Sequence, residues 1–277
     1  MMGLPLVLHI PHSAPAIPDL AYPPIILDEE DLARELLRMT DWFTEQLFAV
    51  EGAAQVIFPI SRLVLDPERF LDDEKETMAR VGMGVTYTRT SEGHALRSEP
   101  TSAQKRDLIE RFYEPHHRAL AGSVDLALVQ HGCALLLDCH SFPSVPLPYE
   151  LDQSPERPQV CLGTDPFHTP AWLLDAAQKV FTARNLTVAV DRPFSGALGP
   201  PKHHWQDKRL LALMIELNRS TYMDESTAHP LESFDPLRSL LHEAVLEAPG
   251  CMPLAPQSGQ MIRNLKDIPS LKSIYSQ

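Results

Sequence analysis

Three short apolar runs along the chain each lead directly into polar residues of catalytic type. The runs and the residues that follow them are Leu6–Ile10 with His12, Ala134–Leu137 with Asp138 and His140, and Leu210–Ile215 with Glu216. Such runs predict buried strands of an α/β sheet, and ligands of open α/β sheets bind beyond the carboxyl ends of the strands. A buried imidazole or carboxylate is costly unless a metal, a partner or a reaction compensates it. The pattern therefore predicts that two histidines and a glutamate meet at one sheet edge, as in a metal hydrolase.

The rest of the pattern predicts helices that alternate with further strands. Asp28 is a favourable N-cap, followed by acidic residues, and predicts a helix that runs to about Phe48. A second helix is expected over Ser102–Leu128, with a kink or break at Pro115. Further helices are predicted over 170–184 and 231–247, and strands over 55–60, 63–65 and 187–190, with a strand or loop over 82–88. No repeat or linker divides the chain, so we expect one α/β domain over 1–277 with an irregular tail from about 250.

Composition limits the partners and the compartment. The formal net charge of −13 argues against a nucleic-acid backbone as partner, because that binding needs clustered Lys and Arg. No apolar run approaches the roughly 20 residues of a membrane span, and the first residues lack the pattern of a secretion signal. The four cysteines form no Cys-x-x-Cys pair, which is typical of reduced thiols. We therefore expect a cytoplasmic protein.

Several short motifs, taken in order, make the chain similar to a known family. They lie at 9–13 (HIPHS), 40–42 (TDW), 61–70 (SRLVLDPERF), 82–90 (GMGVTYTRT), 138–141 (DCHS), 193–197 (PFSGA) and 215–219 (IELNR). Over roughly residues 6–223 the chain resembles the N-formylglutamate amidohydrolases, which are related in fold to the zinc carboxypeptidases. The resemblance implies a mixed central sheet flanked by helices and one bound zinc ion. Ala14 departs from the family pattern, which usually has Gly there, and this concerns loop geometry.

His12 and His140 are the expected zinc ligands. Neutral imidazole is a common zinc ligand, and a loop that leaves a strand can direct it across the sheet edge. His9 competes with His12, but it lies within the strand and also fits a hydrogen-bonded core histidine. Because residues two apart in a strand face the same side, Asp138 and His140 point together. A carboxylate at Asp138 would then fix the tautomer and orientation of the His140 ring.

The third zinc ligand is expected to be Asp41. The related carboxypeptidases place a glutamate three residues after the first histidine, but here that position is Pro15. Asp41 lies in the Thr-Asp-Trp motif, on a helix stripe beside Leu37 and Phe48 where an unpaired charge would be costly. Two histidines and one carboxylate leave the open position that a catalytic zinc needs. The alternative is a structural Asp41 paired with an arginine.

Glu216 is the expected general base. A glutamate near an activated water can take its proton and pass it to the leaving amine. Its apolar strand argues against a solvated surface glutamate. The alternative is a buried ion pair with Arg219 or another arginine.

Arg62 and Arg69 are expected to bind the substrate. Their segment resembles the substrate-recognition segment of the carboxypeptidases, and a guanidinium offers a planar fork that matches a carboxylate. By that resemblance Arg69 binds a substrate carboxylate, and Arg62 does the same or polarises the scissile carbonyl. The alternative for both is surface salt bridging to neighbouring acidic residues, namely Glu68, Asp72 or Asp73.

The resemblance implies zinc-dependent hydrolysis of N-formyl-L-glutamate to formate and L-glutamate, late in histidine degradation. The substrate is a small molecule, with neither a nucleic acid nor a membrane as partner, and the sequence holds no pattern that fixes an oligomeric state. A second enzymatic hypothesis keeps the same residues but acts on another N-acyl amino acid or small amide. A third, from another class, is a catalytically inactive, metal-containing small-molecule-binding protein; the retained Glu216 argues against it, because a binding protein needs no base.

Overall fold

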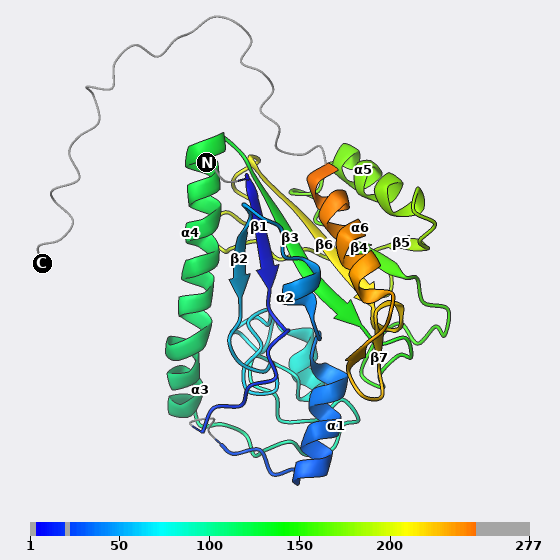
Figure 1. Ribbon diagram of the computed structural model, residues 1–277. Coiled ribbons are helices and arrows are strands. Elements are labelled where there is room, and N and C mark those ends of the chain that lie inside the picture. The colour runs from blue at the N-terminus through cyan, green and yellow to red at the C-terminus, as the bar shows by residue number, and fades with distance from the viewer. Residues whose placement is uncertain (1–3, 20–22, 248–277) are drawn as a thin grey trace, which may run out of the picture.

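A mixed six-stranded sheet forms the centre of the molecule (Figure 1). The computed structural model describes residues 4–19 and 23–247, so the tail predicted from about 250 lies outside the described residues. The strand order is β2-β1-β3-β6-β4-β5. Strands β2, β1, β3 and β6 run parallel to one another, β4 is antiparallel to β6, and β5 is parallel to β4. Their bounds are β1 Leu6–Ile10, β2 Ala54–Ile57, β3 Ala134–Phe142, β4 Val160–Gly163, β5 Val188–Val190 and β6 Leu210–Asn218. The prediction of a mixed α/β sheet is confirmed.

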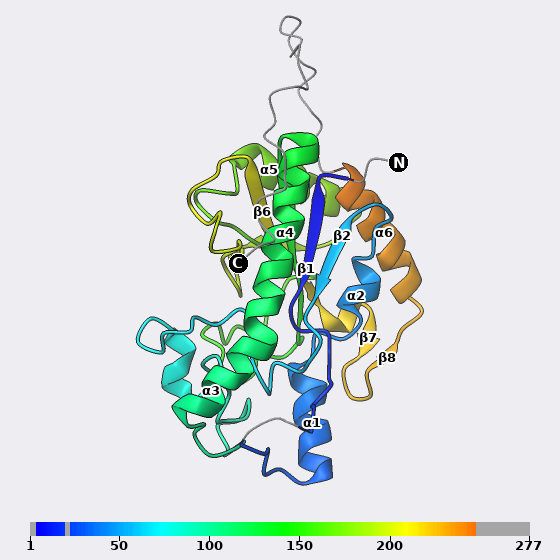
Figure 2. The same ribbon diagram turned by 90° about the vertical axis from the view of Figure 1, so that its left-hand side faces the viewer.

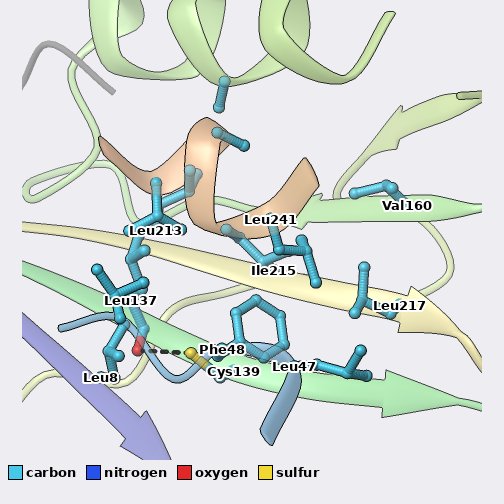
Figure 3. Close-up of a cluster of buried hydrophobic side chains, with 14 of the residues drawn as sticks. Leu8, Leu47, Phe48, Leu137, Cys139, Val160, Leu213, Ile215, Leu217 and Leu241 are labelled. Atoms are coloured by element: carbon cyan, nitrogen blue, oxygen red, sulfur yellow. Dashed lines mark hydrogen bonds between the residues drawn. The ribbon is translucent and has the colours of Figure 1, made fainter. Parts of the chain in front are cut away.

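Helices cover both faces of this sheet. Helix α4 (Glu114–His131) crosses one face, and α2 (Thr44–Leu47), α5 (Ala171–Thr182) and α6 (Phe234–Glu247) lie on the other (Figures 1 and 2). Alternate residues of each strand therefore enter two different cores, one of which is shown in Figure 3. Cys139 packs in this core beside Leu137 and Ile215. Its side chain thus points away from that of His140, as strand alternation predicts.

The helix predicted from Asp28 to Phe48 is interrupted in the structure. Helix α1 (Glu29–Met39) begins at the predicted N-cap, where the Asp28 carboxylate accepts from the Asp31 amide, but it ends at Thr40. Phe43 then adopts a left-handed conformation with φ 67°, from which the short α2 starts. The break leaves Asp41 outside both helices, with its backbone N–H donating to the His12 carbonyl at 3.0 Å. Asp41 is therefore anchored to the end of β1.

The break expected at Pro115 takes the form of a π-helical turn. Helix α3 (Ser102–Leu108) passes into η2 (Ile109–Tyr113), a wider turn that leads directly into α4. Proline has no N–H to donate and its ring clashes with the carbonyl four residues earlier, so a widened turn relieves the conflict. Between α2 and α3 the chain has one short 3₁₀ turn, η1 (Thr77–Val81). After β6 come the 3₁₀ turn η3 (Arg219–Thr221) and the small hairpin of β7 (Met223–Asp224) and β8 (His229–Pro230).

The strand predicted over 63–65 is wrong, the segment 82–88 takes its loop alternative, and one strand was missed. Residues 63–65 form turns, and 82–88 contribute only an isolated bridge between Met83 and Tyr87. These segments are apolar because they are buried against α1 and α3 rather than paired in a sheet. Strand β4, which follows the proline-rich loop after His140, was not predicted. No helix in residues 4–19 and 23–247 is long and apolar enough to cross a membrane.

Candidate active site

The polar residues predicted to meet at the sheet edge do so, around a cavity of about 180 Å³. His12 follows β1, and His140 and Glu216 are direct cross-strand partners in the parallel pair β3–β6. Asp41, Arg62 and Arg69 also line the cavity, so every residue predicted to bind metal or substrate or to act as base reaches it. Asp138, predicted to orient His140, is not one of the lining residues, but its Oδ1 lies 3.2 Å from His140 Nε2.

His12 has one ring nitrogen paired and one free. Its Nε2 lies 2.9 Å from Asp66 Oδ1. Its Nδ1 is buried without a hydrogen-bond partner, at 3.7 Å from Asp41 Oδ2. A carboxylate on one nitrogen places the proton there and leaves the lone pair of the other nitrogen available. The Nδ1 edge of His12 therefore presents a lone pair toward Asp41.

His140 turns the same ring edge toward Asp41, but its Nδ1 is hydrogen-bonded there rather than free. Its Nδ1 lies 3.2 Å from the same oxygen of Asp41, and its Nε2 lies 3.2 Å from Asp138 Oδ1. Asp138 thus contacts the ring that it was predicted to orient. Glu68 Oε1 is also within 3.3 Å of His140 Nε2. Both histidines consequently direct Nδ1 toward Asp41 and Nε2 toward other carboxylates.

Asp41 is held from its opposite side by Arg219. Arg219 Nη2 donates to Asp41 Oδ1 at 2.8 Å, while its Nε donates to Ser141 Oγ at 3.1 Å. Burial alone would raise the pKa of Asp41, but the neighbouring imidazoles of His12 and His140 and the charge of Arg219 hold it below its usual range. The carboxylate is thus ionised, with one oxygen fixed by Arg219 and the other facing the two imidazoles.

Glu68 is a further candidate ligand that the sequence reasoning did not single out. Its side chain is 13% exposed, and Oε2 lies 3.6 Å from His12 Nε2. Glu68 belongs to two sets of three residues, and within each set the potential ligand atoms lie within 4.8 Å of one another. The sets are His12, Glu68 and His140, and His9, Glu68 and Asp138. The only sequence signal was its place in the motif at 61–70, two residues after Asp66.

His9 has both ring nitrogens occupied. Nδ1 lies 2.8 Å from Asp138 Oδ1, and Nε2 lies 2.8 Å from His116 Nε2. Asp138 Oδ2 in turn accepts from the Leu198 amide. His9 therefore has the contacts of a hydrogen-bonded core histidine, which was the alternative for it.

Glu216 is 7% exposed, and its Oε2 has no hydrogen-bond partner. Burial raises the pKa of this carboxyl to about 7; nearby His140 and Arg219 lower it, while Asp41 and Glu68 raise it. Among the described residues no ion pair joins Glu216 to Arg219, whose guanidinium contacts Asp41 instead. A carboxyl that titrates near neutral pH and faces a cavity is suited to accept and return a proton.

Arg62 and Arg69 converge on one buried carboxylate. Arg62 Nη2 donates to Asp66 Oδ2 at 2.9 Å, and Arg69 Nε lies 3.7 Å from the same oxygen. The Tyr87 hydroxyl also donates to Asp66 Oδ2. Arg69 Nε is buried without a hydrogen-bond partner. Of the proposed surface partners, Asp72 pairs with Lys75 and Asp73 with Lys105, while Glu68 lies against His12 and His140. Both guanidinium groups thus line the cavity as cations next to a single shared acid.

The helix region around Pro115 holds the segment that carries Glu68 and Arg69. Tyr113, the last residue of η2, donates its hydroxyl to the Arg69 carbonyl at 3.2 Å. His117 Nε2, one turn into α4, lies 2.8 Å from the Pro67 carbonyl. These two bonds flank Glu68 and fix its backbone.

The donor set suits a divalent metal ion. Burial alone would lower the pKa of His12 and His140, but the surrounding carboxylates raise both. The carboxylates around the two imidazoles therefore favour a positive charge at this place. The free Nδ1 of His12 and the ionised Asp41 are nitrogen and oxygen ligands of the type that zinc accepts. The structure therefore offers a site that fits a metal ion.

The fold and cavity define an α/β protein whose site lies beyond the carboxyl ends of parallel strands, as in many α/β enzymes. A profile of the N-formylglutamate amidohydrolase family matches residues 4–223, so the chain belongs to this family of amidohydrolases. The resemblance found in the sequence is thereby confirmed. A comparison with curated proteins gives no match.

Two solved structures are similar over most of the chain. The N-formylglutamate amidohydrolase from Ralstonia eutropha JMP134 has a TM-score of 0.76 and 25% identity, covering 89% of this chain and 93% of that chain. The gene product Atu2144 from Agrobacterium tumefaciens has a TM-score of 0.60 and 18% identity, covering 88% of this chain and 91% of that one, and supports the fold.

Proposed function

We propose that the chain hydrolyses N-formyl-L-glutamate to formate and L-glutamate with one bound zinc ion. Family membership and the similar amidohydrolase structure support the reaction. The observation that carries the site assignment is the buried, unpartnered Nδ1 of His12 opposite Asp41 Oδ2. His12, His140 and Asp41 are the proposed ligands.

The choice of Asp41 rests on which edge of each imidazole faces it. Metal-bound histidines usually donate their other N–H to a carboxylate. His12 Nε2 is already paired with Asp66, and His140 Nε2 with Asp138, which leaves both Nδ1 atoms facing Asp41 Oδ2 at 3.7 and 3.2 Å. A set built on Glu68 would need both Nε2 atoms and would displace these carboxylates. We therefore propose that Glu68 lies near the metal without binding it.

The remaining residues supply the proton transfers and the grip on the substrate. Zinc, when bound, polarises an amide carbonyl and lowers the pKa of water. Glu216 Oε2 takes a proton from the attacking water as the new C–O bond forms at the formyl carbon. The same carboxyl returns that proton to the glutamate nitrogen as the C–N bond breaks. Arg69, with Arg62 beside it, binds the carboxylates of the glutamate portion.

Metal content tests the ligand assignment. Asp41→Asn and Glu68→Gln form a matched pair, because each keeps the size of the side chain and removes its charge. We expect Asp41→Asn, His12→Ala and His140→Ala to lose bound zinc, measured per chain after dialysis, while Glu68→Gln retains it. Loss in Glu68→Gln with retention in Asp41→Asn would transfer the third ligand to Glu68. Full occupancy in both histidine variants would refute the site.

A further inference from the structure

A single buried arginine joins the segments on one side of the cavity. Arg157, in the loop between β3 and β4, has a side chain that is 2% exposed. Its Nη1 donates to the Pro143 carbonyl at 3.0 Å. Its Nη2 donates to the Glu150 carboxylate and to the Asp152 carbonyl. One guanidinium thus ties the end of β3 to the loop that contains residues 147–152.

The same guanidinium lies against two aromatic rings. Its Cζ is 5.4 Å from the centroid of the Phe142 ring and 5.7 Å from that of Phe194. The two rings meet edge to face, with centroids 5.8 Å apart. A cation held over aromatic faces is attracted by their quadrupoles, and the attraction grows where water is excluded. Arg157 therefore also fixes Phe194, which comes from the loop after β5.

These segments form one wall of the site cavity. Phe142, Tyr149 and Phe194, called here the aromatic wall, line the cavity of about 180 Å³ that also contains Glu216. Arg157 is absent from that lining and instead lines a separate cavity of about 290 Å³. It thus supports the aromatic wall from behind.

We infer that Arg157 is a positioning residue whose aromatic wall limits the acyl group of the substrate to formyl. The inference rests on the proposed function. Tyr149 lies near Arg62 and Arg69, so Phe142 and Phe194 are the apolar members of the wall. With the substrate carboxylates bound at the two arginines, the acyl substituent is placed against these two rings. A formyl group presents a hydrogen there, whereas an acetyl group presents a methyl. A fixed apolar wall discriminates one such carbon by roughly 10- to 200-fold.

The test compares kcat/KM for N-acetyl-L-glutamate with kcat/KM for N-formyl-L-glutamate. We expect the acetyl-to-formyl ratio to rise about tenfold or more in Arg157→Met, with unchanged zinc content. Arg157→Lys keeps the charge but loses the planar fork, so it should restore the ratio only in part. Arg192→Met is the control, because Arg192 lines the same rear cavity but pairs with Asp152 at the surface, with a side chain 67% exposed.

A second variant keeps the inference testable if Arg157→Met fails to fold with Glu150 left unpaired. Phe194→Ala leaves the Arg157–Glu150 pair intact and should raise the same ratio. An unchanged ratio in the folded variants, with both rates falling in parallel, would overturn the inference. An equal rise in Arg192→Met, or wild-type enzyme that accepts acetyl as well as formyl, would also overturn it. Wild-type enzyme that releases no formate would instead refute the proposed function itself.

Discussion

Replacing Glu216 by glutamine tests catalysis and folding separately at a buried position of the site. A glutamine side chain would match the size of Glu216, which is 7% exposed and has one oxygen without a partner, so the packing around β6 should persist. The amide cannot accept the proton of the attacking water. We expect kcat to fall by a factor on the order of 10² to 10⁴, which corresponds to about 3–5 kcal/mol in the activation free energy.

The same substitution should not lower the free energy of unfolding, although it lowers kcat. Because burial raises the pKa of Glu216 to about 7 in the folded metal-free chain, its contribution to stability is present below the unfolded pKa and lost as the pH rises through about 7. A neutral amide avoids this loss. We therefore expect the unfolding free energy of metal-free Glu216→Gln at pH 8 to equal or exceed that of the wild type, measured by urea unfolding.

The assay is formate release at saturating N-formyl-L-glutamate, with zinc per chain measured on the same samples. Glu243→Gln, on α6 with a side chain 67% exposed, serves as the matched control and should keep wild-type kcat. Near-normal kcat in Glu216→Gln with zinc retained would refute the reasoning and make Glu216 a structural residue.

Two further predictions concern substrate binding and pH. Arg69→Ala should raise KM with little change in kcat, because Arg69 binds the substrate carboxylate equally in the ground and transition states. An unchanged KM in steady-state kinetics would show that Arg69 does not bind the substrate. His116 is buried against His9 and the Phe58 ring. Burial is the main cause that lowers its pKa to about 2, and the nearby His9 adds to the effect. Because the unfolded chain binds a proton at this histidine below about pH 6.5, the free energy of unfolding should fall as the pH drops below that value. Between pH 7 and pH 5 this single histidine should lower the free energy of unfolding by about 2 kcal/mol. Urea unfolding of His116→Gln should show a decrease with pH that is smaller by this amount. An identical pH dependence of the unfolding free energy in wild type and His116→Gln would contradict the prediction.

The strand ends could be predicted because their pattern is local. Each central strand is an apolar run with a polar residue at its end, and parallel strands bring such ends to one sheet edge. Strand alternation likewise placed Asp138 with His140 and turned Cys139 to the opposite core. These features need no knowledge of distant contacts.

Features that depend on tertiary packing were missed. The apolar stripe through Asp41 favoured one continuous helix, but the bond from its N–H to the His12 carbonyl and the left-handed Phe43 interrupt it. Glu68 reaches the histidines because Tyr113 and a neighbouring histidine hold its loop from a helix more than 40 positions away in the sequence. Neither contact leaves a local signal.

Formate release by the wild-type chain, measured as a function of bound zinc, tests the central claim most directly. We expect the zinc-loaded chain to release formate from N-formyl-L-glutamate, the chelated chain to release none, and added zinc to restore the rate. The site predicts one zinc per chain at full activity, because His12, His140 and Asp41 form one ligand set. Formate release that is unchanged by complete removal of metal, or a fully loaded chain that releases none, would contradict the account.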